Sequence, residues 1–389
     1  MFSSRLPARL EVNTVSRAIA RRRAAGATLL DLTITNPTEV GISYPAGVLS
    51  SLCDDRADRY APEPLGWPEA RAAVAAEAAT PGTLIAPSQI VLTSSTSEAY
   101  SLLFKLLCDA GDRVLVPQPS YPLFEMLTRL ESVEAGVYRL EHHGAWSIDR
   151  ASLERVLSDT TRAVLVVSPN NPTGSMMRAA DLDWLTALCA ARGIALIADE
   201  VFADYPLMPR EDARRVAGDR RALTFSLGGL SKSAGLPHLK LGWIVVSGPD
   251  DRIAEAINRL EVICDTYLSV STPVQVAAPR LIEAGKVMRA AIAARVTRNL
   301  RRLQDRVGSF PSLALLEPEG GWSAVLRVPR TTSEEALVLR LLEDADVIVH
   351  PGYFFDFAEE AFLVVSLLPA PEMFDAAIAR LLPIAAGAR

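Results

Sequence analysis

Two short apolar segments constrain the fold of this chain more than any other feature. Ala163–Val167 and Ile194–Ala198 are apolar throughout, without the alternation of polar and apolar residues that marks a strand with one solvated face. Both faces of such a strand must be buried. Strands of this kind are typical of a mainly parallel sheet that carries helices on both sides, so the sequence predicts an α/β fold.

Similar units surround these two strands. An amphipathic helix is expected at Pro68–Ala79, and from there to residue 250 short apolar runs alternate with turns and helices. The further runs are Ile90–Leu92, Arg113–Val116, Ala222–Phe225 and Trp243–Val246. The N-terminal part predicts a helix at Val15–Arg23 and a strand at Leu29–Thr33. Beyond residue 250 we expect helices at Ile253–Cys264, Val274–Ile282 and Lys286–Val307, then a strand-helix-strand section.

At 389 residues the chain exceeds one compact core, so two domains are expected. We predict a large domain at 37–280 and a smaller α+β domain built from both chain ends, 1–36 and 281–389.

Composition limits the class of function. The 46 acidic and 40 basic residues give a net charge of −6, which opposes binding to nucleic acid or to an anionic membrane. Four scattered cysteines predict no disulfide framework, and the His142–His143 pair lacks neighbouring ligands for a metal. The N-terminus has no apolar signal core and no run is long enough to span a bilayer, so we expect a cytoplasmic protein.

Polar clusters follow three of the predicted strands. They contain Tyr121, Asn171 and Asp199, and in a parallel sheet the carboxyl ends of the strands meet at one edge, where ligands bind. Each cluster alone is explained by ordinary turn chemistry. Three clusters at successive strand ends favour a binding site instead.

Lys232 stands among small residues between two apolar strands, which is unusual for a surface lysine. Desolvation lowers the pKa of a lysine and frees its amine to form imines. Neither GxxxxGK[ST] nor GxGxxG is present, which opposes a P-loop and a dinucleotide-binding fold.

The motifs taken together resemble those of the class I/II aminotransferases, which are fold type I pyridoxal-phosphate enzymes of the aspartate aminotransferase superfamily. The resemblance covers nearly the whole chain. It rests on the order and spacing of Tyr60 and Gly66, Ser95-Thr96-Ser97, Pro119–Pro122, Pro169–Gly174, Asp199–Phe202, Leu230–Lys232 and Leu241–Trp243. It implies pyridoxal 5'-phosphate as the cofactor and a large-domain sheet of the seven-stranded type.

The resemblance also implies residue roles. Lys232 would hold the cofactor as a Schiff base and act as the general base, with Asp199 on the pyridine nitrogen. Asn171 would donate to the ring oxygen and contact substrate, and Tyr121 would stack on the ring. The N-terminus of the helix that begins at Ser95, Thr96 and Ser97 would hold the phosphate. Tyr60 would reach the phosphate of a neighbouring subunit, which implies a homodimer with shared active sites.

Three positions depart from the family pattern. Lys240 stands where an arginine usually grips the phosphate, and it keeps the charge without the two-pronged geometry. Phe202 replaces a tyrosine whose hydroxyl contacts the ring oxygen, and Tyr205 is a nearby substitute. Val364 replaces the arginine that binds the substrate carboxylate, and Arg327 is the candidate replacement.

We therefore expect an aminotransferase that moves an amino group from an amino acid or amine donor to a keto acid. The same cofactor also serves C–S lyases and decarboxylases, which remain the alternative. A ligand-sensing regulator fused to a DNA-binding domain is disfavoured, because the resemblance begins within the first few tens of residues.

Overall fold

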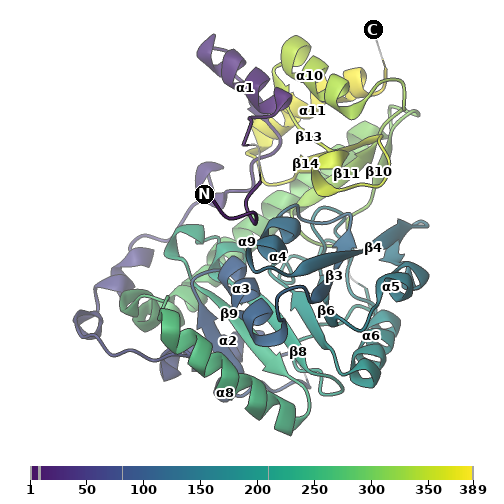
Figure 1. Ribbon diagram of the computed structural model, residues 1–389. Helices are drawn as coiled ribbons and strands as arrows, with labels where there is room; N and C mark the ends of the chain where they lie inside the picture. Colours follow the sequence, from purple (N-terminus) through teal and green to yellow (C-terminus); the bar gives the residue numbers. More distant parts are fainter. Residues whose placement is uncertain (1, 8–9, 81, 209, 388–389) are drawn as a thin grey trace.

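The computed structural model describes residues 2–7, 10–80, 82–208 and 210–387. Its largest element is an eight-stranded sheet in the order β2-β9-β8-β7-β6-β3-β4-β5 (Figure 1). Strands β8, β7, β6, β3 and β4 pair in parallel, whereas β9 and β5 run antiparallel to their neighbours. The predicted α/β fold is confirmed, and the three-residue edge strand β5 brings the number of strands to eight. The strands are β2 (Ile90–Thr93), β3 (Arg113–Gln118), β4 (Glu134–His142), β5 (Trp146–Ile148), β6 (Thr161–Val167), β7 (Ala195–Asp199), β8 (Thr224–Gly229) and β9 (Gly242–Ser247).

The central strands are buried on both faces, as their uniform apolar sequence predicts. Leu165 and Ile197 pack in one core with α3 and α8, while Val164 and Leu196 point the other way into a core with α5 and α6. A third core joins α2 and the start of α9 to β2 and β9. Figure 1 shows these helices on both sides of the sheet. They are α2 (Pro68–Ala78), α3 (Thr96–Leu107), α5 (Arg150–Val156), α6 (Ala179–Arg192), α8 (Asp250–Tyr267) and α9 (Thr272–Val307); α4 (Phe124–Leu130) follows β3.

A second, smaller layered unit combines both chain ends. Its four-stranded antiparallel sheet has the order β10-β11-β14-β13, and a two-stranded sheet pairs β1 with β12. Because β1 comes from the N-terminal part and β12 from the C-terminal part, the two ends share one core. The division at 37–280 remains a prediction. The elements are α1 (Thr14–Ala24), β1 (Leu30–Asp31), β10 (Ala314–Leu316), β11 (Ser323–Arg327), α10 (Glu334–Ala345), β12 (Val347–Ile348), β13 (His350–Pro351), β14 (Phe362–Ser366) and α11 (Pro371–Ala385).

Helix α9 connects the two units without a break. We expected two helices, 274–282 and 286–307, but the structure has one helix of 36 residues. Met288 packs in a core of the large sheet, and Ile292, one turn later, packs in the core of the small unit. The gap left between the two predicted helices, at 283–285, is part of the helix in the structure, and Gly285 serves close packing there. A Cβ there would lie 2.6 Å from the Cβ of Ala234.

None of the described helices is long and apolar enough to cross a membrane.

We expect Gly285→Ala to lower the free energy of unfolding by about 1–3 kcal/mol, because the new methyl group overlaps Ala234. In an open helix the same change stabilises by about 1 kcal/mol, so the sign is diagnostic. Gly308→Ala at the end of α9 is the matched control, since its Cβ would lie 3.7 Å from the nearest atom. Urea unfolding measures both variants. A Gly285→Ala protein at least as stable as the wild type would contradict the packing argument.

Candidate active site

A cavity of about 240 Å³ opens at the carboxyl ends of β6, β7 and β8, where a parallel sheet binds ligands. Seven residues singled out in the sequence line it together: Ser95, Thr96, Ser97, Tyr121, Asn171, Asp199 and Lys232. The other lining residues are Thr35, Phe124, Val167, Val201, Phe202, Gly229, Ser231, Leu241, Gly242 and Ser323.

Lys232 lies on the short helix α7 (Leu230–Ser233), directly after β8. Desolvation lowers the pKa of Lys232 to about 8, against a smaller opposing effect of the Asp199 carboxylate. Its Nζ atom lies 4.9 Å from the ring centre of Trp322 and 5.5 Å from that of Phe202. Roughly a tenth of the amine is therefore neutral and nucleophilic at neutral pH, far more than for an exposed lysine.

Two hydrogen bonds fix the backbone at this lysine. The hydroxyl of Tyr205 donates to the carbonyl of Lys232 at 2.5 Å, and Nε of Arg289 donates to the carbonyl of Ser233 at 2.8 Å. Arg289 lies on α9 and also pairs with Glu77. The lysine is thus held from two sides, by the loop after β7 and by the helix that joins the two units.

Asp199 ends β7 and faces the same cavity. Desolvation raises the pKa of its carboxyl group, while hydrogen bonds from the hydroxyl of Tyr100 at 2.8 Å and the backbone N–H of Val201 at 3.1 Å oppose that shift. Charged carboxylates are costly to bury unless they are paired. A cationic group in the cavity, such as a protonated pyridine nitrogen, would relieve this cost.

The N-terminus of α3 forms a cradle for an anion. Ser95 is the N-cap residue, and its hydroxyl accepts a hydrogen bond from the N–H of Glu98 at 3.1 Å. Thr96 and Ser97 at the start of this 12-residue helix lie on the cavity wall, where the helix dipole favours negative charge. Gly242 lies close by, and a Cβ there would approach the carbonyl carbon of Ser95 to 3.1 Å. These donors, together with the amine of Lys232 and the carboxylate of Asp199, suit the phosphate, the aldehyde and the pyridine nitrogen of pyridoxal phosphate.

Asn171 and Tyr121 line the wall on the side of β3 and β6. The Oδ1 atom of Asn171 accepts a hydrogen bond from the hydroxyl of Ser323 at 3.3 Å. Phe202 supplies a ring without a hydroxyl group. Tyr205 does not replace that group, because its hydroxyl is bonded to the Lys232 carbonyl and the residue does not line the cavity.

Three of the predicted site residues are not brought to the cavity. Tyr60 is 75% exposed and lines a separate surface hollow with Tyr267. Lys240 is exposed, in the left-handed conformation that follows the 3-10 helix Pro237–Leu239, although the next residue, Leu241, lines the cavity. Arg327 lies at the exposed end of β11.

The position of the missing arginine is apolar. Val364 is 2% exposed and packs with Val325, Phe355 and Trp146. Of the described residues that line the cavity, only Lys232 carries a cationic side chain. A substrate carboxylate would therefore meet no guanidinium among these residues.

Several residues of the site were missed in the sequence. Tyr100 lies four residues after Thr96, so the helical period of α3 turns both toward the sheet, and this signal was available. Ser231 directly precedes Lys232. Thr35 and Ser323 come from the small unit, and only its packing against the sheet places them in the cavity.

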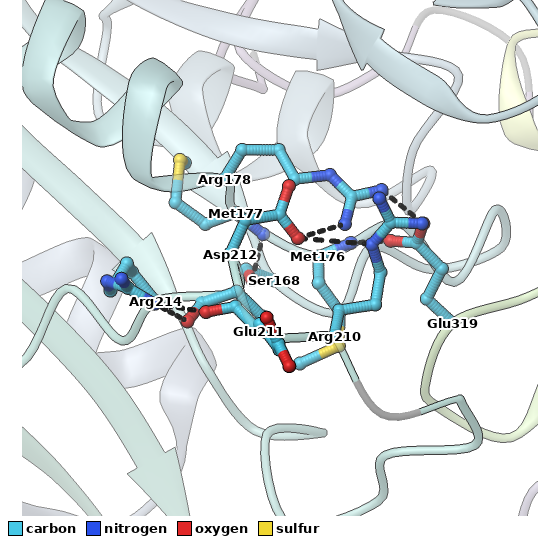
Figure 2. A network of polar contacts seen from close by, with 10 residues as sticks. Ser168, Met176, Met177, Arg178, Arg210, Glu211, Asp212, Arg214 and Glu319 are labelled. Atoms are coloured by element: carbon cyan, nitrogen blue, oxygen red, sulfur yellow. Dashed lines mark hydrogen bonds and ion pairs between the residues drawn. The ribbon is translucent and has the colours of Figure 1, made fainter.

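A buried carboxylate ties the small unit to the loop after β6. The carboxylate of Glu319 accepts a hydrogen bond from the N–H of Met176 at 3.0 Å and pairs with the guanidinium groups of Arg178 and Arg210 (Figure 2). Glu319 is 3% exposed, so these partners compensate a charge that water does not reach. We call these four residues the Glu319 clamp.

The backbone strengthens the same junction. The N–H groups of Glu319 and Gly320 both donate to the carbonyl of Gly174, at 3.1 and 3.0 Å. Gly174 has a φ of +72°, and a Cβ there would lie 2.7 Å from the carbonyl oxygen of Gly320. The loop that carries Asn171 and the segment that leads to Ser323 are therefore in close contact.

Known proteins are similar to this chain over most of its length. The family model for aminotransferase class I and II matches residues 54–381. The alanine aminotransferase of Mycobacterium tuberculosis is 27% identical over 94% of this chain and 88% of its own length. The glutamate-pyruvate aminotransferase of Haemophilus influenzae is 24% identical over 94% of this chain and 93% of its own length.

Solved structures show the same fold. The alanine aminotransferase from Pyrococcus furiosus superposes with a TM-score of 0.89 at 22% identity, covering 100% of both chains. The aspartate aminotransferase from Thermotoga maritima gives a TM-score of 0.84 at 22% identity, over 98% of this chain and 99% of that one. With the family model matching most of its length, the chain belongs to the class I and II aminotransferases and is a pyridoxal-phosphate-dependent transaminase.

Proposed function

We propose that Lys232 holds pyridoxal 5'-phosphate covalently and that this chain transfers an amino group between an amino donor and a keto acid at the cavity described above. The observation that carries the proposal is the pair of opposite groups on one wall. Lys232 has a lowered pKa, and Asp199 is a half-buried carboxylate for which the described part of the chain supplies no ion pair.

The side chains divide the work as follows. Bound pyridoxal phosphate supplies an electron-withdrawing ring that accepts the electron pair left at Cα when a proton departs. Asp199, to which the hydroxyl of Tyr100 donates a hydrogen bond, would keep the pyridine nitrogen protonated. Lys232 would hold the cofactor, and its free amine would accept the proton that leaves Cα of the substrate.

The remaining contacts set position. Of the residues that line the cavity, Tyr121 would stack on the ring, Asn171 would donate to the ring oxygen, and the start of α3 with Ser231 would hold the phosphate. Lys240 would add charge on the phosphate side. A carboxylate-bearing substrate would meet hydroxyl groups of Thr35 and Ser323 at the wall of the small unit.

The proposed homodimer rests on Tyr60. Its ring is 75% exposed beside Tyr267, which is 55% exposed, so this face can receive a second copy of the chain. In that arrangement Tyr60 would reach the phosphate held by the partner subunit.

The visible absorption spectrum tests the function directly. Purified protein mixed with pyridoxal phosphate should develop a visible band that bleaches with suitable amino acids and returns with a keto acid. Lys232→Ala should show no such band while keeping its circular dichroism and melting temperature. Lys286→Ala, an exposed lysine on α9, is the control and should behave as the wild type. A coloured Lys232→Ala protein would disprove the lysine assignment. Release of ammonia or carbon dioxide from an amino acid, without an added keto acid acceptor, would indicate lyase or decarboxylase chemistry.

The lowered pKa of Lys232 predicts a pH dependence. Only the neutral amine attacks the cofactor, so the rate of colour formation in cofactor-free protein should rise with pH through a midpoint of about 8, below the usual 10.5. Asp199→Asn removes the charge that raises the pKa of Lys232, so the midpoint should move down. Stopped-flow absorbance across pH 6–10, a range of roughly two units around the midpoint, measures it. A midpoint near the ordinary lysine value would contradict the desolvation argument.

Arg327 remains the proposal from sequence for the substrate carboxylate. It shares a face of β11 with Ser323, but four residues of strand span roughly 13 Å, so the guanidinium must reach back toward the cavity. On this proposal Arg327→Ala raises KM for the amino donor about tenfold or more, because a charged hydrogen bond contributes about 1.5–3 kcal/mol. Arg330→Ala, whose exposed side chain pairs with Glu359, is the control. An unchanged KM would reject Arg327.

A further inference from the structure

The hydrogen bond between Asn171 and Ser323 matters because residue 202, a phenylalanine, supplies no hydroxyl group to the cavity. The tyrosine hydroxyl that the family pattern places at residue 202 is absent, and the hydroxyl of Tyr205 is bonded to the Lys232 carbonyl. Of the two residues to which the family pattern gives a contact with the ring oxygen, 171 and 202, only Asn171 carries a donor, its side-chain amide.

An asparagine amide has two nearly isosteric ends with opposite roles, since Nδ2 donates and Oδ1 accepts. Only Nδ2 is useful to an electron-rich ring oxygen, and a reversed amide would set two acceptors against each other. Asn171 Oδ1 accepts the hydrogen bond of Ser323 at 3.3 Å, and no hydrogen bond within the described part of the chain engages Nδ2. The amide therefore presents its donor to the cavity.

We propose that Ser323 is a positioning residue: its hydroxyl donates to Oδ1 of Asn171 and so directs Nδ2 of Asn171 toward the ring oxygen of the bound cofactor. A hydrogen bond accepted at the amide oxygen also polarises the amide and strengthens its N–H donors. Ser323, which belongs to the small unit, would thus influence the negative charge on the ring oxygen of the cofactor through Asn171. The inference rests on the proposed function, because it assumes that Asn171 faces the cofactor.

The surroundings of Ser323 keep this geometry. The Glu319 clamp fixes the segment just before β11 against the loop of Asn171 (Figure 2). Trp322 is 1% exposed, packs its ring on Phe202 with centroids 5.3 Å apart, and accepts a hydrogen bond at its carbonyl from Leu367. These contacts hold the first residue of β11, Ser323, in place, and with it the hydroxyl group.

Ser323 also lines the cavity itself, so a direct contact with substrate is the competing role. The two roles differ in what they affect. A substrate contact changes KM and leaves the substrate-free enzyme unaltered. An effect through Asn171 changes the substrate-free enzyme, because the cofactor is already bound there.

The test is a pH titration of the visible absorbance of the cofactor-loaded enzyme without substrate. The absorbance reports a proton shared between the ring oxygen and the nitrogen of Lys232. A donor to the ring oxygen draws negative charge from it and weakens its hold on that proton. Loss of the donor therefore raises the midpoint.

We expect Ser323→Ala to raise the midpoint by about half a pH unit, as a weakened hydrogen bond does, and Asn171→Ala to raise it further. Ser323→Thr keeps the hydroxyl and should restore the wild-type midpoint. Adding Ser323→Ala to Asn171→Ala should cause no further shift, because the serine acts through the amide. The matched control is Ser366→Ala, directly opposite Ser323 on β14 with its hydroxyl bonded to the carbonyl of Ile34. Its midpoint should equal that of the wild type.

The outcomes separate the two levels of the proposal. A wild-type protein without a titrating visible band overturns the proposed function and this inference with it. If the wild type and Asn171→Ala behave as expected but Ser323→Ala keeps the wild-type midpoint, only the role of Ser323 is rejected. An unchanged midpoint with a raised KM would identify a substrate contact. An additive shift in the double variant would also reject action through Asn171.

Discussion

The burial of the central strands on both faces is the constraint on which the rest of the structure depends. Because β6 and β7 have no solvated face, their polar residues can stand only where the strands end. Asn171 and Asp199 follow from this placement, and helix starts such as that of α3 collect at the same edge. The position of the site therefore follows from the sheet, because polar side chains that bind ligands can lie only at the ends of its buried strands.

Charge in this cavity is governed by desolvation. Removal from water lowers the pKa of Lys232 and raises the pKa of Asp199, so both groups are moved toward their neutral forms. Each opposes the shift of the other. A cofactor that offers a carbonyl to the amine and a basic ring nitrogen to the carboxylate satisfies both groups at once, which is why the pair has more diagnostic value than either residue alone.

The sequence predicted the parts of the fold that depend on local pattern. The apolar runs at 163–167 and 194–198 became β6 and β7, and the predicted helix at 68–79 is α2. Strand β4, next to the edge strand β5, was missed because its exposed and buried residues are mixed. The predicted helices left out 283–285, which the structure includes in α9, because helix propensity does not register a packing neighbour such as Ala234 beside Gly285. In the site, Lys232, Asp199 and Asn171 were found from motifs. The roles of Ser323 and Tyr205 were not predicted, because each depends on a contact between residues far apart in the sequence. Ser323 and Asn171 are 152 positions apart, and Tyr205 and Lys232 are 27 apart.

Helix α9 has a mechanical consequence. It is anchored in the core of the large sheet at Met288 and in that of the small unit at Ile292. Between them, Arg289 donates a hydrogen bond to the carbonyl of Ser233, next to Lys232. Because α9 is packed in a core on either side of Arg289, the helix carries this side chain with it when it tilts. A tilt of the small unit relative to the large sheet would therefore act, through Arg289, on the backbone next to Lys232.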